Sequence, residues 1–154
     1  MKSHPWNKSF VWESHTAQSG AVTQAQIDQF DELGFFVLDD IYSPEELAEL
    51  TRITDESEDE AIAELKKQAD ERFLISENGA ITFAAQIVRQ KPEIRPFVQN
   101  AKILGVCSDL IGPNVRMYHD QAVYKMTEKP RRFPWHQDNG YLYVEPQHYL
   151  TCWI

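Results

Sequence analysis

The sequence predicts an α+β domain in which helices buttress one side of a β-sandwich or barrel. Two helix-start signals lie in the N-terminal half, and strand-like segments accumulate toward the C-terminus. The chain has 154 residues and is 42% hydrophobic, enough to bury a core and typical of a folded protein. We expect one domain from residue 23 to residue 154, preceded by an arm of residues 1–22 without a clear hydrophobic period.

The helix-start signals are capping boxes, in which a hydroxyl side chain and a Gln or Glu three positions later satisfy free backbone N–H groups. The two boxes are Thr23 with Gln26, and Ser43 with Glu46. Gly34 is placed to end the first helix. The acidic run of residues 55–60 either breaks the second helix or forms its solvated face. Residues 92–112 predict one or two further short helices.

Several segments have the pattern of strands. Residues 35–38 are a short apolar run, and residues 73–75 and 81–83 flank an Asn-Gly turn signal. Residues 114–126 form the longest predicted strand, and both of its faces mix polar with apolar side chains, which suits a strand that lines a polar cavity. Residues 149–154 are a last apolar strand, and an edge this apolar calls for a partner. We therefore expect the sheet to be incomplete in this chain.

The net charge, the N-terminal sequence and the cysteine content argue against several classes of protein. The net charge of -9 argues against non-specific binding to nucleic acid or to an anionic membrane surface. The polar N-terminus has no apolar signal-peptide core, and no segment is long enough to span a bilayer, so a cytoplasmic protein is predicted. Cys107 and Cys152 suggest no disulfide framework and are expected to be buried, reduced thiols.

The strongest chemical signal is His136 followed two positions later by Asp138. On an extended strand both side chains leave the same face. One imidazole and one carboxylate are two thirds of a 2-His-1-carboxylate triad, the ligand set of many non-haem Fe(II) oxygenases. His-x-Asp alone is a weak motif, and the alternative is that His136 caps a loop while Asp138 makes an Asx-turn.

Several further stretches of the sequence resemble one known protein family. In chain order they are residues 29–38, 43–47, 110–115, Lys125, 135–141 and 150–154. Together they resemble the N-terminal half of the phytanoyl-CoA dioxygenase family of Fe(II)/2-oxoglutarate oxygenases. The last two stretches are the specific ones. The resemblance implies a double-stranded β-helix (jelly-roll) core that is incomplete in this chain, with His136 and Asp138 as two of the three Fe(II) ligands.

The same resemblance implies that the co-substrate 2-oxoglutarate lies against Gln121, Lys125 and Trp153. Gln121 and Lys125 also share one face of the predicted strand, where an amide and an ammonium can meet a dicarboxylate. The alternatives are solvent-facing polar residues for these two and a core position for Trp153. The third ligand, a His, and the Arg that anchors the far carboxylate are expected beyond Ile154.

The resemblance thus makes residues 23–154 the N-terminal part of a single dioxygenase domain, truncated at the C-terminus and inactive alone. The complete enzyme is expected to use dioxygen and 2-oxoglutarate to hydroxylate a small molecule at an unactivated C–H bond, releasing succinate and carbon dioxide. Asp138 favours hydroxylation, because halogenating relatives carry a small residue there. One alternative is a non-catalytic jelly-roll interaction or regulatory module without a complete metal site. Another is a cupin-like metalloenzyme that does not use 2-oxoglutarate.

Overall fold

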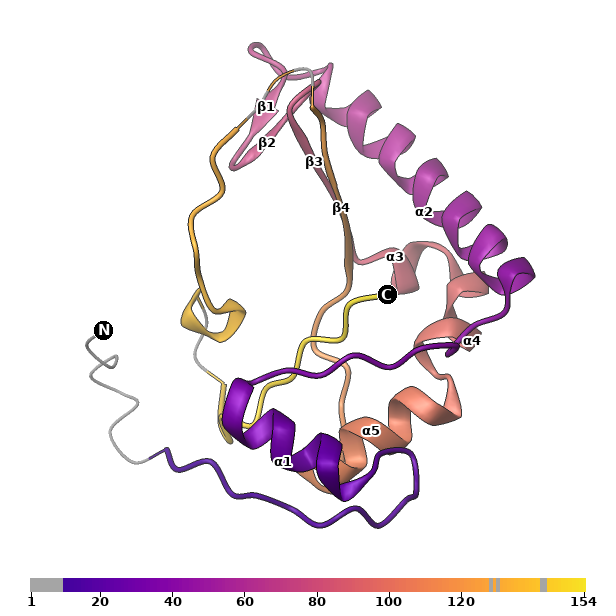
Figure 1. Ribbon diagram of the computed structural model, residues 1–154. Coiled ribbons are helices and arrows are strands. Elements are labelled where there is room, and N and C mark those ends of the chain that lie inside the picture. The colour runs from indigo at the N-terminus through magenta and orange to yellow at the C-terminus, as the bar shows by residue number, and fades with distance from the viewer. Residues whose placement is uncertain (1–9, 128, 130, 142–143) are drawn as a thin grey trace. The chain divides into compact units, whose positions relative to one another are not determined.

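The computed structural model describes residues 10–127, 129, 131–141 and 144–154. The chain forms two compact units. Unit 1 comprises Met1–Asp39, Asn100–Arg116 and Pro134–Ile154, and unit 2 comprises Asp40–Gln99 and Met117–Phe133. Helices and one antiparallel sheet are both present, as an α+β protein requires (Figure 1).

Unit 1 is built on two helices, α1 (Gln24–Leu33) and α5 (Ala101–Ile111). The predicted capping box begins α1, and Gly34 ends it in the left-handed conformation with φ 79°. Residues on both helices and on the arm before α1 meet in one apolar cluster, whose buried members are Val22, Ile27, Val106 and Leu110. The helices of unit 1 therefore share a core with part of the predicted arm.

Asp109 on α5 fixes that arm. Its carboxylate accepts hydrogen bonds from the backbone N–H of Gln18 at 3.0 Å and of Ser19 at 2.8 Å, and from the Ser19 hydroxyl at 2.8 Å. Burial alone would raise the pKa of Asp109, but these hydrogen bonds to the charged form lower it below its ordinary value. The described part of the arm, from residue 10, is thus an ordered part of unit 1 although it contains no helix.

Unit 2 begins with the long helix α2 (Pro44–Leu65), which also starts at its predicted capping box. The acidic run lies inside this helix, where Asp55, Glu56, Asp59 and Glu60 are exposed and Glu58 is half-buried. Ile53, Ser57 and Leu65 are buried at intervals of four or eight positions, which places them along one stripe. Among the described residues, no helix combines the length and the apolar composition needed to cross a membrane.

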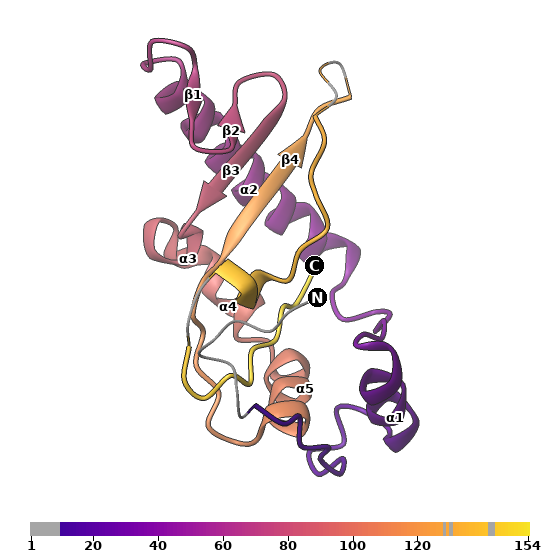
Figure 2. The ribbon, with the colours of Figure 1, turned by 90° about the vertical axis from the view of Figure 1, so that its left-hand side faces the viewer.

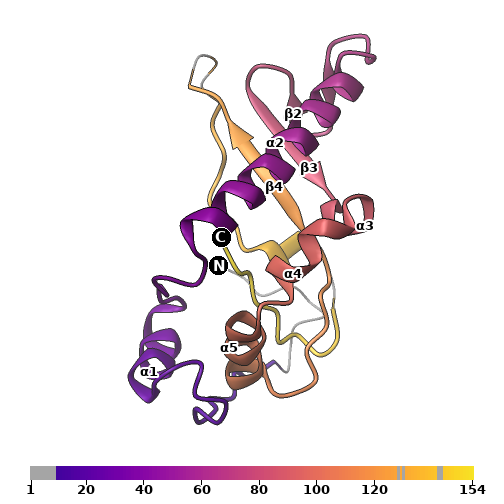
Figure 3. The same ribbon diagram turned by 90° about the vertical axis from the view of Figure 1, so that its right-hand side faces the viewer.

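The sheet of unit 2 has four antiparallel strands in the order β1-β2-β3-β4. They are β1 (Arg72–Phe73), β2 (Ser76–Glu77), β3 (Ile81–Ala85) and β4 (Gln121–Lys125). Figures 2 and 3 view unit 2 from opposite sides, and together they show α2 covering one face of β3 and β4. The core of unit 2 lies at this contact and includes Ile53 of α2 and Ala84 of β3.

Three short helical turns follow β3 and close the core of unit 2. They are α3 (Ile87–Gln90), η1 (Pro92–Ile94) and α4 (Arg95–Val98). Each contributes one buried apolar residue to the cluster around Ile53, namely Ile87, Ile94 and Phe97. The prediction of helix over residues 92–112 is confirmed, but three elements, η1, α4 and α5, lie there instead of one or two.

Several strand predictions were wrong in extent. The Asn-Gly turn is present, with Gly79 at φ 73°, but its first strand is β2 and not residues 73–75. The long strand of residues 114–126 is reduced to β4, because its partner β3 has only five residues. Residues 35–38 and 149–154 form no strand, since nothing in the described part of the chain pairs with them.

Candidate metal centre

His136 and Asp138 come together in unit 1, and the distance between Nε2 of His136 and Oδ1 of Asp138 is 3.2 Å. Their segment is not the strand that the spacing suggested. Residues 134–137 are irregular, and the 3₁₀ turn η2 (Asp138–Tyr141) follows. A hydrogen bond of 2.8 Å from the backbone N–H of Gly140 to the carbonyl of Gln137 closes this turn. The pair therefore lies where an irregular segment enters a turn, and not on a strand.

The imidazole of His136 is oriented by its own backbone. Nδ1 lies 2.9 Å from the carbonyl oxygen of Pro134, which can only accept, so Nδ1 carries a proton and donates it. In the neutral ring, Nε2 then presents a lone pair to the carboxylate of Asp138. A nitrogen lone pair and a carboxylate oxygen face each other stably only with a cation, either a proton or a metal ion, between them.

The spacing of the two donors fits a metal ion. Two ligands bound side by side to one octahedral cation at about 2.1 Å lie about 3 Å apart. The 3.2 Å between Nε2 and Oδ1 agrees with this value. The hydrogen bond from Nδ1 to a backbone carbonyl is also the usual way in which a metal-bound histidine is fixed. The chemistry and the geometry of the pair suit two adjacent ligands of Fe(II).

Thr151 was not predicted from the sequence, yet it belongs to the site. Its hydroxyl donates a hydrogen bond of 3.1 Å to Oδ2 of Asp138. The two oxygens of the carboxylate thus have different partners, His136 on Oδ1 and Thr151 on Oδ2. The only signal for Thr151 in the sequence was its position inside the family-like stretch of residues 150–154.

The two predicted ligands, His136 and Asp138, are the histidine and the acidic residue that meet in this way. Over the described ranges, no three His, Cys, Asp or Glu side chains gather in a way that would hold a metal ion. His148 packs against the rings of Phe10 and Trp12, with centroid distances of 5.4 and 5.8 Å. His119 contacts Oε1 of Gln121 at 3.4 Å. The described residues therefore bring together one imidazole and one carboxylate, which could supply two of the ligands of a metal ion.

Comparison with known proteins identifies the context of this pair. The family described as phytanoyl-CoA dioxygenase (PhyH) matches residues 30–154. The chain belongs to this family. Its fold is a jelly roll, and the helices and antiparallel sheet seen here are consistent with the predicted α+β class. No solved structure gives a significant match to the chain.

Two curated relatives from the phytanoyl-CoA dioxygenase family are both named ectoine dioxygenase. The protein from Nocardia farcinica is 24% identical over 121 residues, which cover 77% of this chain and 39% of the relative. The protein from Sphingopyxis alaskensis is 27% identical over 135 residues, which cover 88% of this chain and 43% of the relative. The chain thus spans about two fifths of the length of these relatives.

The residues expected to contact 2-oxoglutarate belong to both units. Gln121 and Lys125 are the first and last residues of β4, where exposed and half-buried positions alternate, so they share one exposed face. Trp153 belongs to unit 1, and its side chain is 92% exposed. The core position considered for Trp153 is therefore wrong in this structure. The role of all three residues toward 2-oxoglutarate stays a prediction.

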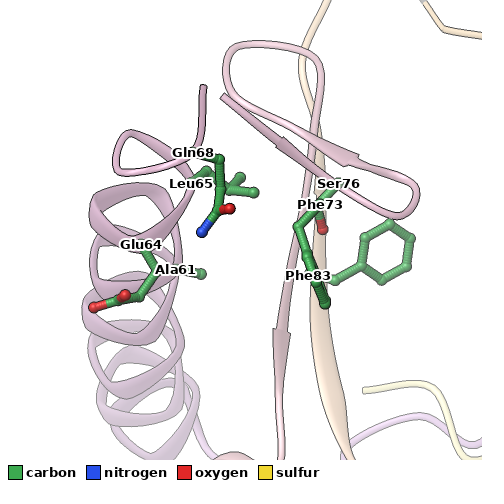
Figure 4. Close-up of a pocket in the computed structure, with 7 residues that line it drawn as sticks. All are labelled: Ala61, Glu64, Leu65, Gln68, Phe73, Ser76 and Phe83. Carbon is green, nitrogen blue, oxygen red and sulfur yellow. The ribbon is translucent and has the colours of Figure 1, made fainter. Parts of the chain in front are cut away.

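A separate hollow lies wholly within unit 2, between the C-terminal end of α2 and the strands (Figure 4). Its volume is about 290 Å³. Its lining residues are mostly apolar and are Ala61, Glu64, Leu65, Gln68, Phe73, Ser76 and Phe83. The one carboxylate among them, on Glu64, is paired with Lys67 at 2.5 Å. This hollow contains no metal-binding pair and is not the candidate centre.

Proposed function

We propose that the chain is part of an Fe(II)/2-oxoglutarate-dependent dioxygenase that hydroxylates a small molecule at an unactivated C–H bond and releases succinate and carbon dioxide. The observation that carries the proposal is the contact of 3.2 Å between His136 and Asp138 in a chain of the phytanoyl-CoA dioxygenase family. Bound Fe(II), with 2-oxoglutarate as electron donor, supplies the reaction with dioxygen.

The chain's own residues have separate tasks in this proposal. Nε2 of His136 and Oδ1 of Asp138 hold two adjacent positions of the metal. The Pro134 carbonyl keeps the proton on Nδ1 of His136, which leaves Nε2 as the ligand atom. The Thr151 hydroxyl occupies Oδ2 of Asp138, which leaves Oδ1 for the metal. Each ligand is thus oriented by one further hydrogen bond.

Gln121 and Lys125 are proposed to bind 2-oxoglutarate. Their Cα atoms lie about 13 Å apart, because each residue of a strand advances the chain by about 3.4 Å. Both side chains are long, so they can converge on a dicarboxylate that lies along the strand. Lys125 supplies a positive charge and Gln121 supplies a neutral hydrogen-bonding group. For Trp153, a residue of unit 1, the family resemblance alone supports the proposed contact with 2-oxoglutarate.

The third metal ligand and the arginine that anchors the far carboxylate of 2-oxoglutarate are proposed to lie beyond Ile154. The chain matches only 39% and 43% of the length of the two curated relatives, which supports this placement. Two protein donors alone hold Fe(II) weakly. On this proposal, residues 23–154 are the N-terminal part of a single domain, and the chain alone is inactive.

The substrate class is a small molecule, and the relatives suggest the first compound to assay. Both are named ectoine dioxygenase, so ectoine leads a panel that also contains fatty acyl-CoA and other amino-acid derivatives. The assay measures succinate formed in the presence of each compound above the background without it. A compound that is hydroxylated in step with succinate formation is a substrate.

The test of the function uses the natural protein over its whole length. His136→Ala and Asp138→Ala are each expected to abolish substrate-dependent succinate formation. His15→Ala and Asp39→Ala are matched controls in unit 1 and are expected to retain it. Unchanged turnover in either ligand variant contradicts the assignment of ligands. Absence of turnover and of Fe(II) binding in the wild-type protein favours the non-catalytic module instead.

A further inference from the structure

The two cysteines of the chain meet in unit 1. Cys107 lies on α5 and is buried as predicted, whereas Cys152 is exposed, so its predicted burial is wrong. Their Sγ atoms are 3.8 Å apart although the residues are 45 positions apart in the sequence. A disulfide bond has an S–S length of about 2.05 Å, so the sulfur atoms must approach by roughly 1.8 Å. Rotation about the Cα–Cβ bonds and a small shift of an exposed segment can supply this movement.

The segment that carries Cys152 is held on two sides. Leu150 packs against the apolar cluster that contains Val106 and Leu110 of α5. Cys152 contacts Cys107 on the same helix. The residue between them, Thr151, donates its hydrogen bond to Asp138. Residues 150–152 therefore link α5 to the carboxylate of the candidate metal centre.

We propose that Cys107 and Cys152 are a redox-active thiol pair, which a hydroperoxide oxidises to an intramolecular disulfide that fixes residues 150–152 against α5 beside Asp138. The supporting observations are the distance between the sulfur atoms, the unequal exposure of the two thiols and the contacts of the segment between them. The disulfide forms without metal or co-substrate, so the proposal does not depend on the proposed function.

The two thiols have unequal chemistry. The Cys107 thiol, as hydrogen-bond donor, lowers the pKa of Cys152 to about 7. The same hydrogen bond, followed by burial, raises the pKa of Cys107 well above its ordinary value. Thiolate character and access together decide which cysteine reacts first. Cys152 is therefore the nucleophile and Cys107 the resolving thiol.

The reaction has two steps. The Cys152 thiolate attacks one oxygen of hydrogen peroxide, the O–O bond breaks, and a sulfenic acid and water form after proton transfer. Cys107 then attacks Sγ of Cys152, the S–O bond breaks, and the second oxygen leaves as water. In total, two thiols lose two protons and two electrons, and one peroxide is reduced to two waters.

The experiment treats the reduced full chain with a small excess of hydrogen peroxide and maps its peptides without reduction. The expected product is one intramolecular link between Cys107 and Cys152, which dithiothreitol reverses. In the oxidised chain, amide hydrogen exchange across residues 149–153 is expected to slow by about ten-fold or more, because the segment can no longer leave α5. Cys152→Ser, a change at an exposed position, is expected to leave Cys107 as a protected free thiol under the same treatment.

Several outcomes of this experiment would overturn the proposal of a redox-active pair. Sulfinic acid on Cys152 beside an unmodified Cys107 would overturn the proposal, as would dimers linked through Cys152 or two unreacted thiols. Unchanged exchange across residues 149–153 after the link has formed would overturn the claim that the disulfide fixes this segment. In Cys107→Ala, which removes the resolving thiol with little change of volume, a trapped sulfenic acid on Cys152 is expected.

Discussion

The hydroxyl of Thr151 donates a hydrogen bond of 3.1 Å to Oδ2 of Asp138. This contact joins the turn η2, which supplies one metal donor, to a segment 13 positions later in the chain. It leaves Oδ1 of the same carboxylate facing His136. The position of the proposed ligand therefore depends on a residue that is not itself a ligand.

Thr151→Val removes this hydrogen bond and keeps the shape of the side chain. We expect Fe(II) affinity to fall by about ten-fold or more, as is common when the partner of a metal ligand is lost. Titration of the natural protein with Fe(II) under anaerobic conditions measures the effect. Thr151→Ser retains the hydroxyl and is expected to bind like the wild type. Equal affinities in all three proteins would show that Thr151 does not orient Asp138.

Gly105→Ala tests the packing of the arm on α5. A Cβ at this position would lie 2.7 Å from Cβ of Ala21 and 3.0 Å from Oγ of Ser19. The clash is expected to cost about 1–3 kcal/mol, and the gain in helix propensity from Gly to Ala offsets only about 1 kcal/mol of it. We therefore expect a net decrease in the free energy of unfolding. Gly140→Ala is the control, since nothing lies within 4 Å of its added Cβ. Urea unfolding compares the two, and a stabilised Gly105→Ala variant would contradict the close approach.

Asp109→Asn tests the electrostatic part of the same contact. Asp109 is 3% exposed and accepts three hydrogen bonds from Gln18 and Ser19. We expect a loss of about 2 kcal/mol in the free energy of unfolding at neutral pH, typical of hydrogen bonds to a buried charged group. Asp39→Asn, at an exposed position, is the matched control.

The pH dependence gives a second measurement on Asp109. Its pKa in the folded protein is below the ordinary value of 3.8, so the ionised form favours folding. This contribution is fully present above pH 3.8 and is lost as the pH falls through the lower folded pKa. The difference between wild type and Asp109→Asn should therefore shrink in acid. A constant difference down to the lowest pH would contradict the assignment.

The pKa of Glu58 on α2 is shifted in the opposite direction from that of Asp109. Burial, followed by the nearby charges of Asp55 and Asp59, raises the pKa of Glu58 above 4.5. The folded state then favours the protonated form, so stability from this group is greatest below pH 4.5 and falls as the pH rises through the raised pKa. We expect Glu58→Gln to raise the free energy of unfolding at pH 7 by about 0.5 kcal/mol. Glu32→Gln is the exposed control, and a destabilised Glu58→Gln variant would contradict the account.

Helix positions were predictable because their signals are local. The capping boxes of Thr23 and Ser43 satisfy backbone N–H groups within the next turn, so four consecutive residues contain the information. The acidic run of residues 55–60 does not interrupt α2, because all of its charged side chains except that of Glu58 are exposed. Glu56, for example, pairs with Arg52 at 2.5 Å.

Strand limits were not predictable in the same way, because a strand ends where its partner ends. The polar and apolar pattern of residues 114–126 continues beyond the five residues that β3 can pair. Residues 35–38 have a strand-like composition, yet Phe35 and Val37 are 59% and 70% exposed while Phe36 and Leu38 pack on the core of unit 1. The prediction of a buried strand was therefore wrong for the backbone and for two of its four side chains.

The candidate metal centre shows the same difference between features with a local sequence signal and features that depend on distant contacts. His136 and Asp138 were found from a spacing of two residues, and they meet in the structure although their segment is not the strand that this spacing suggested. Thr151 and the pair Cys107 and Cys152 depend on contacts between distant parts of the chain. Such contacts leave no local pattern in the sequence.

The most direct test of the central claim is anaerobic addition of Fe(II) and then 2-oxoglutarate to the natural protein over its whole length, followed in the visible spectrum. We expect a metal-to-ligand charge-transfer band that is absent in both His136→Ala and Asp138→Ala and present in Asp39→Ala. A band that persists in either ligand variant, or that is missing from the wild-type protein, would contradict the assignment of His136 and Asp138 as ligands of a 2-oxoglutarate-binding iron.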